Sequence, residues 1–238
     1  MDTSTSAICK SCQQPGTGKF CSYCGQSLYL KRITVSGLLH EVFHFFTHLD
    51  KGFGYTLKQL IQRPGHMQRE YLEGQRNRHQ KPFSFFFISA TVMGLSLYWI
   101  NILLEYIYSE GNMAEGAFFH QYMVFLVVFS MPYFALIKYI FFHNSGYNFA
   151  ETGVLVLYMM SVLFLIVIIA NTFKFFWPGL ETRYIEVPSV LIYSIQTNIH
   201  FYKQQAKWKV VIKTILGSSL WFFTIAKTQD LIVDKFFR

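Results

Sequence analysis

Residues 152–173, TGVLVLYMMSVLFLIVIIANTF, form a run of 22 residues without a charged side chain. Residues 83–104, FSFFFISATVMGLSLYWINILL, form a second uncharged run of the same length. About 20 helical residues cross a hydrocarbon core of roughly 30 Å, so each run is long enough to span a membrane. A helix or strand in a soluble core is seldom so uniformly apolar over this length. The two runs therefore predict an all-α integral membrane protein.

Three further apolar runs complete the expected bundle. Residues 118–142 contain one Lys near an end and one Pro inside, whereas residues 188–202 and 210–226 are shorter or carry polar groups. We expect about five transmembrane helices, over 83–104, 118–142, 152–173, 188–202 and 210–226. Four spans are the alternative, with one of the last two segments re-entrant or lying on the membrane surface.

Composition and charge support this class and orient the chain. Hydrophobic residues make up 52% and charged residues 14%, against about 25% charged in soluble domains. Residues 1–82 hold eleven Lys and Arg against five Asp and Glu, which is six of the eight net positive charges. The positive-inside rule places this head in the cytoplasm. Five spans return the later basic cluster to the same side, whereas three would not; that cluster is Lys203, Lys207, Lys209 and Lys213.

All four cysteines lie in the head, as two C-x-x-C pairs separated by eight residues: Cys9, Cys12, Cys21 and Cys24. Four thiolates at about 2.3 Å around one ion form a closed structural zinc site. Two disulfides, free thiols, a redox pair or iron are the alternatives, and a reducing cytoplasm disfavours disulfides. We expect one zinc ion and a zinc ribbon over residues 1–30, with Pro15-Gly16, Gly18 and Gly25 in its turns.

An amphipathic helix is expected over residues 38–49, LLHEVFHFFTHL. His40, Glu41 and His44 match the H-E-x-x-H pattern of zinc proteases, and His48 continues the polar face. A catalytic metal site and a non-catalytic second metal site are the alternatives to a plain polar face. We favour the plain face, because a five-residue pattern with two free positions arises often by chance. A second amphipathic segment covers residues 55–62, and both suit helices in the membrane interface.

Five basic residues form a collar immediately before the first span: Arg63, Arg69, Arg76, Arg78 and Lys81. Each such charge contributes about 1 kcal/mol of attraction to an anionic leaflet. The collar is therefore a candidate site for anionic lipid headgroups or phosphate, although any cytoplasmic juxtamembrane segment looks similar. We expect no nucleic-acid partner, because no recognition-helix pattern accompanies the charge. Residues 31–82 thus comprise interfacial helices and collar, and residues 83–238 the bundle.

Several polar side chains interrupt the spans, and exposure of such groups to lipid is costly. We expect them to face the bundle interior, where they form helix–helix hydrogen bonds or line a substrate or proton pathway. They are Asn101, Asn171, Gln196 and Asn198, with Glu105 and Glu151 at span ends.

The head also resembles the domain of unknown function 3667, a family of zinc-ribbon-headed bacterial membrane proteins. The resemblance extends over about residues 9–90 and is architectural afterwards, where residues 147–151 and the Lys203–Lys213 stretch look similar to family features. It implies zinc on the four cysteines and an inner-membrane location, and it implies no activity. Thr152 stands where many members have His, so we place no ligand there. The motifs that carry the resemblance are Cys21-Ser-Tyr-Cys24-Gly25-Gln26, Lys31-Arg32-Ile33-Thr34, Asp50-Lys51-Gly52-Phe53 with Thr56 and Leu57, Arg63-Pro64-Gly65, Tyr71-Leu72-Glu73-Gly74-Gln75-Arg76 and Lys81-Pro82-Phe83.

Together these features predict a multi-pass protein of the bacterial inner membrane with a cytoplasmic N-terminus. We expect the zinc head to be a binding, assembly or regulatory module for a protein partner or for anionic lipids. The alternatives are a small transporter or lipid-handling protein, and a membrane metalloprotease using His40, Glu41 and His44. The sequence favours a non-enzymatic role, and it leaves a homo-oligomer open.

Overall fold

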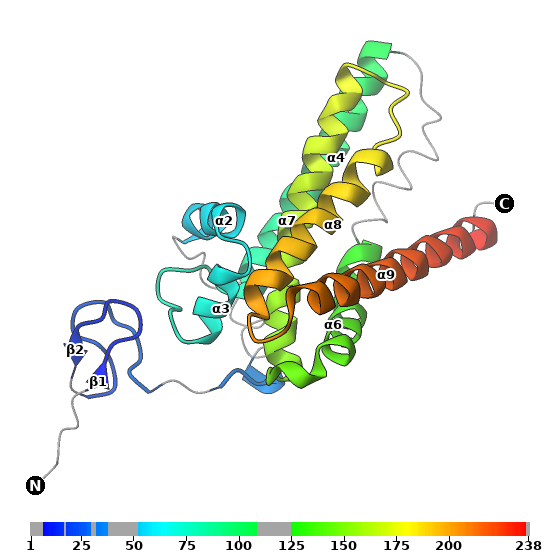
Figure 1. Ribbon diagram of the computed structural model, residues 1–238. Coiled ribbons are helices and arrows are strands. Elements are labelled where there is room, and N and C mark those ends of the chain that lie inside the picture. Colours follow the sequence, from blue (N-terminus) through cyan, green and yellow to red (C-terminus); the bar gives the residue numbers. More distant parts are fainter. Residues whose placement is uncertain (1–6, 17, 30–31, 38–51, 109–124, 237–238) are drawn as a thin grey trace, which may run out of the picture.

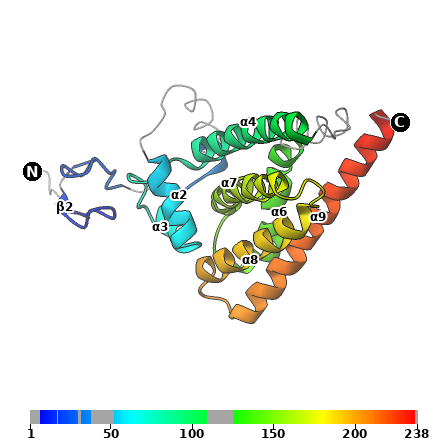
Figure 2. The same cartoon turned by 90° about the horizontal axis from the view of Figure 1, so that it is seen from above.

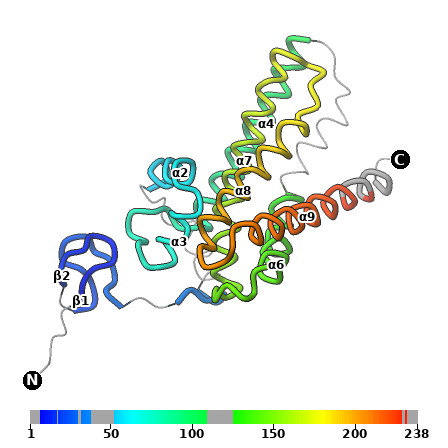
Figure 3. Tube along the Cα trace, viewed as in Figure 1, coloured from blue at the N-terminus to red at the C-terminus, as the bar shows by residue number. Residues whose placement is uncertain are grey.

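The structure is a computed structural model that describes the backbone of residues 7–16, 18–29, 32–37, 52–108 and 125–236 (Figures 1 and 3). The helix expected over residues 38–49, with His40, Glu41, His44 and His48, lies outside the described residues. No geometry therefore bears on the metalloprotease alternative.

The described chain is mainly helical, with a small sheet in the head. Strands β1 (Ala7–Ile8) and β2 (Pro15–Gly16) pair antiparallel. Single 3-10 turns lie at His143–Ser145 and Phe173–Phe175. The helices are α2 (Phe53–Gln62), α3 (His66–Leu72), α4 (Pro82–Tyr108), α6 (Met131–Phe141), α7 (Phe149–Thr172), α8 (Arg183–Phe201) and α9 (Lys207–Phe236).

Helix α7 is the centre of the bundle. It packs against α4, α6 and α8, which surround it in the view from above (Figure 2). Every residue from Ala150 to Phe164 is buried. A helix that is apolar on all sides is suited to a protein core or to a membrane span. In this fold the neighbouring helices cover it, so the uncharged run at residues 152–173 is the innermost helix.

Within the described part of the chain, three helices are long and apolar enough to cross a membrane: Pro82–Tyr108, Phe149–Phe175 and Lys207–Thr228. They coincide with three of the expected spans and support a membrane protein. The expected span at 118–142 lies partly outside the described residues, and its described part includes the 11-residue helix α6. Helix α8 has 19 residues but is less apolar, because it carries Glu186, Asn198 and His200. The count of five spans stays a prediction.

In Figure 1, the end of α4 and the start of α8 lie toward one end of the bundle, and α3 and the turn between α8 and α9 lie toward the other. At one end, the Tyr108 hydroxyl of α4 donates to the Phe175 carbonyl beyond α7, at 2.6 Å. At the other end, the centre of the His66 ring in α3 lies 4.6 Å from the centre of the His200 ring in α8. The basic cluster that follows α8 is thus at the same end as α3 and the head, as a five-span topology requires.

Some of the polar side chains that interrupt the expected spans are buried in the bundle, and others are not. Asn171, Asn198 and Glu151 are buried, as expected, whereas Asn101 and Glu105 are half-buried. The expectation for Gln196 is wrong, because its side chain is exposed. The buried residues of α8 include Ser194 and Asn198. At about 100° per residue, a position two residues from each of them falls on the opposite side of the helix.

Candidate metal centre

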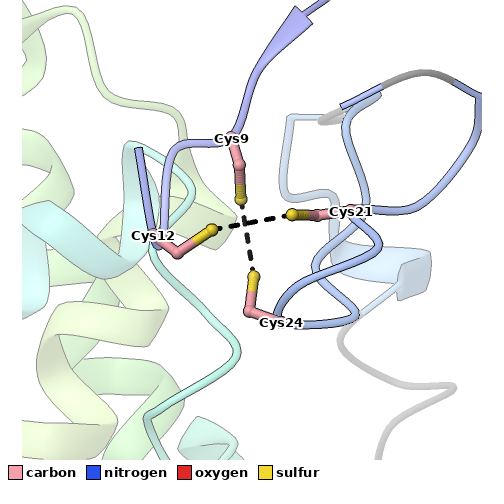
Figure 4. A group of neighbouring side chains, drawn as sticks. All are labelled: Cys9, Cys12, Cys21 and Cys24. Atoms are coloured by element: carbon pink, nitrogen blue, oxygen red, sulfur yellow. Dashed lines mark hydrogen bonds between the residues drawn. The ribbon is translucent and has the colours of Figure 1, made fainter. Parts of the chain in front are cut away.

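Two loops of the same design bring the four cysteines together (Figure 4). In each loop the amide of the first cysteine donates to the carbonyl five residues later, Cys9 to Gln14 and Cys21 to Gln26. The carbonyl of the same cysteine accepts from the amide four residues later: Cys9 from Gln13, and Cys21 from Gly25. Gln13 and Gly25 have φ values of 62° and 71°. Glycine adopts positive φ without steric cost, which explains Gly25.

The turn expected at Pro15-Gly16 is wrong, because these residues form strand β2. Gln13 makes the turn instead, with its positive φ. Gly16 serves close packing, since a Cβ there would lie 2.8 Å from Leu28 Cδ1.

The four sulfurs point at one common centre and lie within 4.8 Å of one another (Figure 4). Cys9 Sγ is 3.5 Å from Cys24 Sγ, and Cys12 Sγ is 3.6 Å from Cys21 Sγ. All four cysteines are free, and a disulfide would need about 2.05 Å. A tetrahedron with metal–sulfur bonds of about 2.3 Å has edges of about 3.8 Å. The spacing of the thiols therefore fits one tetrahedral metal ion better than any oxidised pairing.

The protein environment already favours a thiolate at one of the four positions. The backbone amide of Cys12 donates to the sulfur of Cys9 and lowers the pKa of Cys9 to about 6. At Cys12 the amide of Gln14 acts in the same direction, but burial and the neighbouring sulfurs outweigh it and raise the pKa of Cys12 to about 12. Four thiolates at this spacing repel one another, and a bound cation removes that repulsion.

The cysteine cluster is joined to the loop that precedes α4. The amide of Asn77 donates to Gln26 Oε1 at 3.0 Å, and the Asn77 side chain donates to the Cys24 carbonyl. Gln26 lies two residues after Cys24 and its carbonyl accepts from the Cys21 amide, so its position depends on that loop. The cysteine cluster is therefore attached to the collar segment through the backbone of Cys24.

A second attachment lies just after the cysteine-bearing residues 1–30. Arg32 forms two hydrogen bonds to the carboxylate of Glu151, at 2.7 and 2.8 Å, and a third to the Gly146 carbonyl at 2.6 Å. Asn148 Nδ2 donates to the Ile33 carbonyl at 3.0 Å. Glu151 also forms a capping box with Asn148 at the start of α7. The segment after the ribbon is thereby fixed to the central helix.

We expect Arg32→Met to lower the free energy of unfolding by about 1–3 kcal/mol, because it leaves the buried Glu151 carboxylate without its cation. Thermal unfolding of the purified protein in detergent measures the loss, with the exposed Arg78→Met as the matched control. A substitution of an exposed surface residue such as Arg78 should change the free energy of unfolding by no more than about 0.5 kcal/mol. A double-mutant cycle with Glu151→Gln should give a coupling energy of about 1 kcal/mol or more. Strictly additive effects would contradict the pairing.

The five basic residues of the collar differ in their contacts. Arg63 pairs with Glu70 at 2.7 Å, and Arg69 with Glu73 at 3.3 Å. Arg76 donates to the Tyr71 carbonyl and lies over the Tyr71 ring. Arg78 and Lys81 are exposed. Headgroup binding by the collar stays a prediction; Arg63 is exposed too but is paired with Glu70.

The segment that contains the collar is the part of the chain that matches a known family. Residues 50–94 match the family described as protein of unknown function (DUF3667). The match begins beyond the cysteines, so it confirms the resemblance over α2, α3 and the first half of α4. Searches of curated proteins and of solved structures found no match.

The motifs within this match contact one another in the fold. The backbone of residues 78–80 lies so close to Gly52 that a Cβ there would be 3.0 Å from the Gln80 amide. That amide donates to Thr56 Oγ1 at 2.8 Å, and the Gln80 carbonyl accepts from the Tyr158 hydroxyl at 2.6 Å. The matched segment is thus a folded unit packed on α7.

The clustering of the four cysteines was predictable from their spacing alone, whereas the two attachments of the head were not. Gln26 ends a motif that carries the family resemblance, but nothing in the sequence pairs it with Asn77. Arg32 and Glu151 lie 119 residues apart. Arg32 belongs to a motif that carries the family resemblance, and Glu151 to a later stretch that looks similar to family features; nothing in the sequence pairs the two residues.

Proposed function

We propose that the four cysteines hold one structural zinc ion, and that the zinc-stabilised head is a docking module of a multi-pass membrane protein. The chemistry of the donors supports zinc, because four closed thiolates with no open position are typical of structural zinc sites. The basic head faces the cytoplasm in this proposal. Its location is the bacterial inner membrane, as the family resemblance implies.

One observation carries the docking role. Four large apolar or aromatic side chains project from the small head and remain about two thirds exposed or more: Ile8 at 68%, Phe20 at 64%, Tyr23 at 73% and Tyr29 at 68%. Exposed large hydrophobic side chains of this kind mark interaction sites more often than free surface. Tyrosine in particular contributes much contact area for little lost entropy. The partner we favour is a protein that contacts the metal-bound head at the membrane surface.

A photo-crosslinking amino acid at Tyr23, in membranes of the cells that make the protein, tests the docking role. We expect a discrete crosslinked product that disappears when Cys24→Ser removes a metal ligand. The same label at Ile212, which is exposed on the apolar helix α9, should crosslink to lipid alone. A product at Tyr23 that survives Cys24→Ser, or the lack of any discrete product, would overturn the proposal.

A further inference from the structure

The turn between α8 and α9 carries an exposed tryptophan among exposed lysines. Trp208 is 63% exposed, and Lys203, Lys207 and Lys209 are exposed as well. Lys209 Nζ lies 5.4 Å from the centre of the Trp208 ring. Tryptophan is highly buried on average in soluble proteins. At a membrane surface, by contrast, an exposed tryptophan is common, because its ring is apolar and its N–H reaches a polar neighbour.

The three lysines have no carboxylate to pair with nearby. Residues 187–229 contain neither Asp nor Glu. In the part of the chain that the structure describes, no carboxylate lies within 4.0 Å of Lys203, Lys207 or Lys209. Three positive charges on one short turn are therefore open to an anion from outside the protein.

Trp208 is the first member of an apolar stripe along α9. At about 100° per residue, the stripe covers an arc of about 100°. The opposite side of the helix holds Val210 and Trp221, which are buried against the bundle. The stripe itself is left without cover by the described residues, and each of its members is at least 39% exposed: Trp208, Ile212, Ile215, Leu216 and Phe223.

The position of the turn along the bundle favours lipid as the cover. Residues Lys207–Thr228 of α9 are long and apolar enough to cross a membrane, so Trp208 lies at the end of a candidate span. The end of a span is where a chain leaves the hydrocarbon core and enters the headgroup region. The turn also begins beside the collar segment (Figure 1), since a Cβ at Gly65 would lie 2.8 Å from the Phe201 amide nitrogen.

We propose that the turn between α8 and α9 is a membrane anchor, in which Trp208 inserts into the headgroup region and Lys203, Lys207 and Lys209 bind the headgroups of anionic phospholipids around it. The exposed stripe of α9 continues this contact along the acyl chains. Apolar area and basic charge act together in such binding, because each contributes its own part of the attraction. The anchor involves no residue of the zinc head, so it does not depend on the docking role proposed above.

The full-length protein in vesicles of mixed phosphatidylcholine and phosphatidylglycerol tests the anchor. Two sets of vesicles have the same composition, but the acyl chains that carry bromine, a contact quencher of tryptophan fluorescence, belong to phosphatidylglycerol in one set and to phosphatidylcholine in the other. The emission lost in Trp208→Phe measures Trp208 alone. We expect phosphatidylglycerol to quench Trp208 at least about threefold more per molecule, because each lysine near the surface attracts anionic lipid.

The lysines are tested by a combined variant, Lys203→Gln with Lys207→Gln and Lys209→Gln. It should bring the two quenching efficiencies to within about 1.5-fold of each other, because the attraction to anionic lipid is lost. Added salt should act in the same direction on the unmodified protein, since exposed charges are screened. Lys227→Gln changes an exposed lysine near the opposite end of the same span. As the control, it should leave the preference unchanged.

Three outcomes would overturn the proposal. Equal quenching by the two lipids, or a preference that persists both in the combined variant and at high salt, would exclude headgroup binding by the lysines. Quenching by neither lipid would show that Trp208 is covered by a protein or lies in water. The salt series uses the unmodified protein, so it tests the lysines even if the combined variant fails to insert. The crosslink at Tyr23 is measured separately, so failure of one proposal leaves the other open to its own test.

Discussion

Purified protein should contain one zinc ion per chain, and replacement of any one of the four cysteines by serine should remove it. A tetrathiolate zinc site in a small domain contributes on the order of 10 kcal/mol, which is most of the folding energy of such a domain. The head buries few side chains besides Cys9, Cys21 and Gln26, so we expect it to unfold without metal. Elemental analysis of the purified protein gives the stoichiometry.

Limited proteolysis shows the structural consequence of zinc loss. In Cys12→Ser, or after chelation, the chain around Phe20 and Tyr23 should be cleaved at least about tenfold faster, while the helical bundle stays resistant. Ser11→Ala, which changes a neighbouring residue that is not a ligand, is the matched control and should keep its zinc. Full zinc content in Cys12→Ser would refute the tetrathiolate site. A second zinc that survives this change would instead indicate a metal site at His40, Glu41 and His44.

Gly65→Ala should be the most destabilising single substitution outside the metal site. Gly65 has a φ of 80° and precedes α3. A Cβ at this position would overlap the Thr197 carbonyl oxygen and lie 2.8 Å from the Phe201 amide nitrogen. Because both contacts are with the backbone of α8, no side chain can move aside. We expect a loss of about 3 kcal/mol or more, from the strained backbone and the steric overlap together.

Gly54→Ala is the matched control for this change. Gly54 lies inside α2, and a Cβ there would meet no atom within 4 Å. Replacement of a helical glycine by alanine stabilises by roughly 0.5–1 kcal/mol. The two variants should therefore shift the midpoint of thermal unfolding in opposite directions. A normal midpoint for Gly65→Ala would show that α3 does not pack on α8 in this way.

Much of the fold could be predicted because the deciding signals are local. The uncharged run at residues 152–173 predicted a membrane helix, and this helix is the buried centre of the bundle. The segment at residues 55–62 predicted a short amphipathic helix, which the structure extends to Phe53–Gln62. The cysteine spacing likewise placed four ligands around one point, because each C-x-x-C pair closes its own turn.

Contacts between segments that are far apart in the sequence could not be predicted from these local signals. Lys138 was visible as the single charge in a 25-residue apolar run, but only the packing of α8 and α9 shows what surrounds it. Gln196 and Asn198 look alike in the sequence, yet one is exposed and the other fully buried. Which side of a helix of mixed polarity is buried depends on the helices packed against it. Tertiary packing determines which helices these are.

The pairing of Arg32 with Glu151 has a consequence for the order of synthesis. The head leaves the ribosome first, but its anchor follows 119 residues later. At about 5–20 residues per second, this separation amounts to roughly 6–24 s. During that interval the four cysteines can come together, but the segment that follows them cannot reach its final position. Attachment of the head therefore has to wait until the first turn of the central helix has been made.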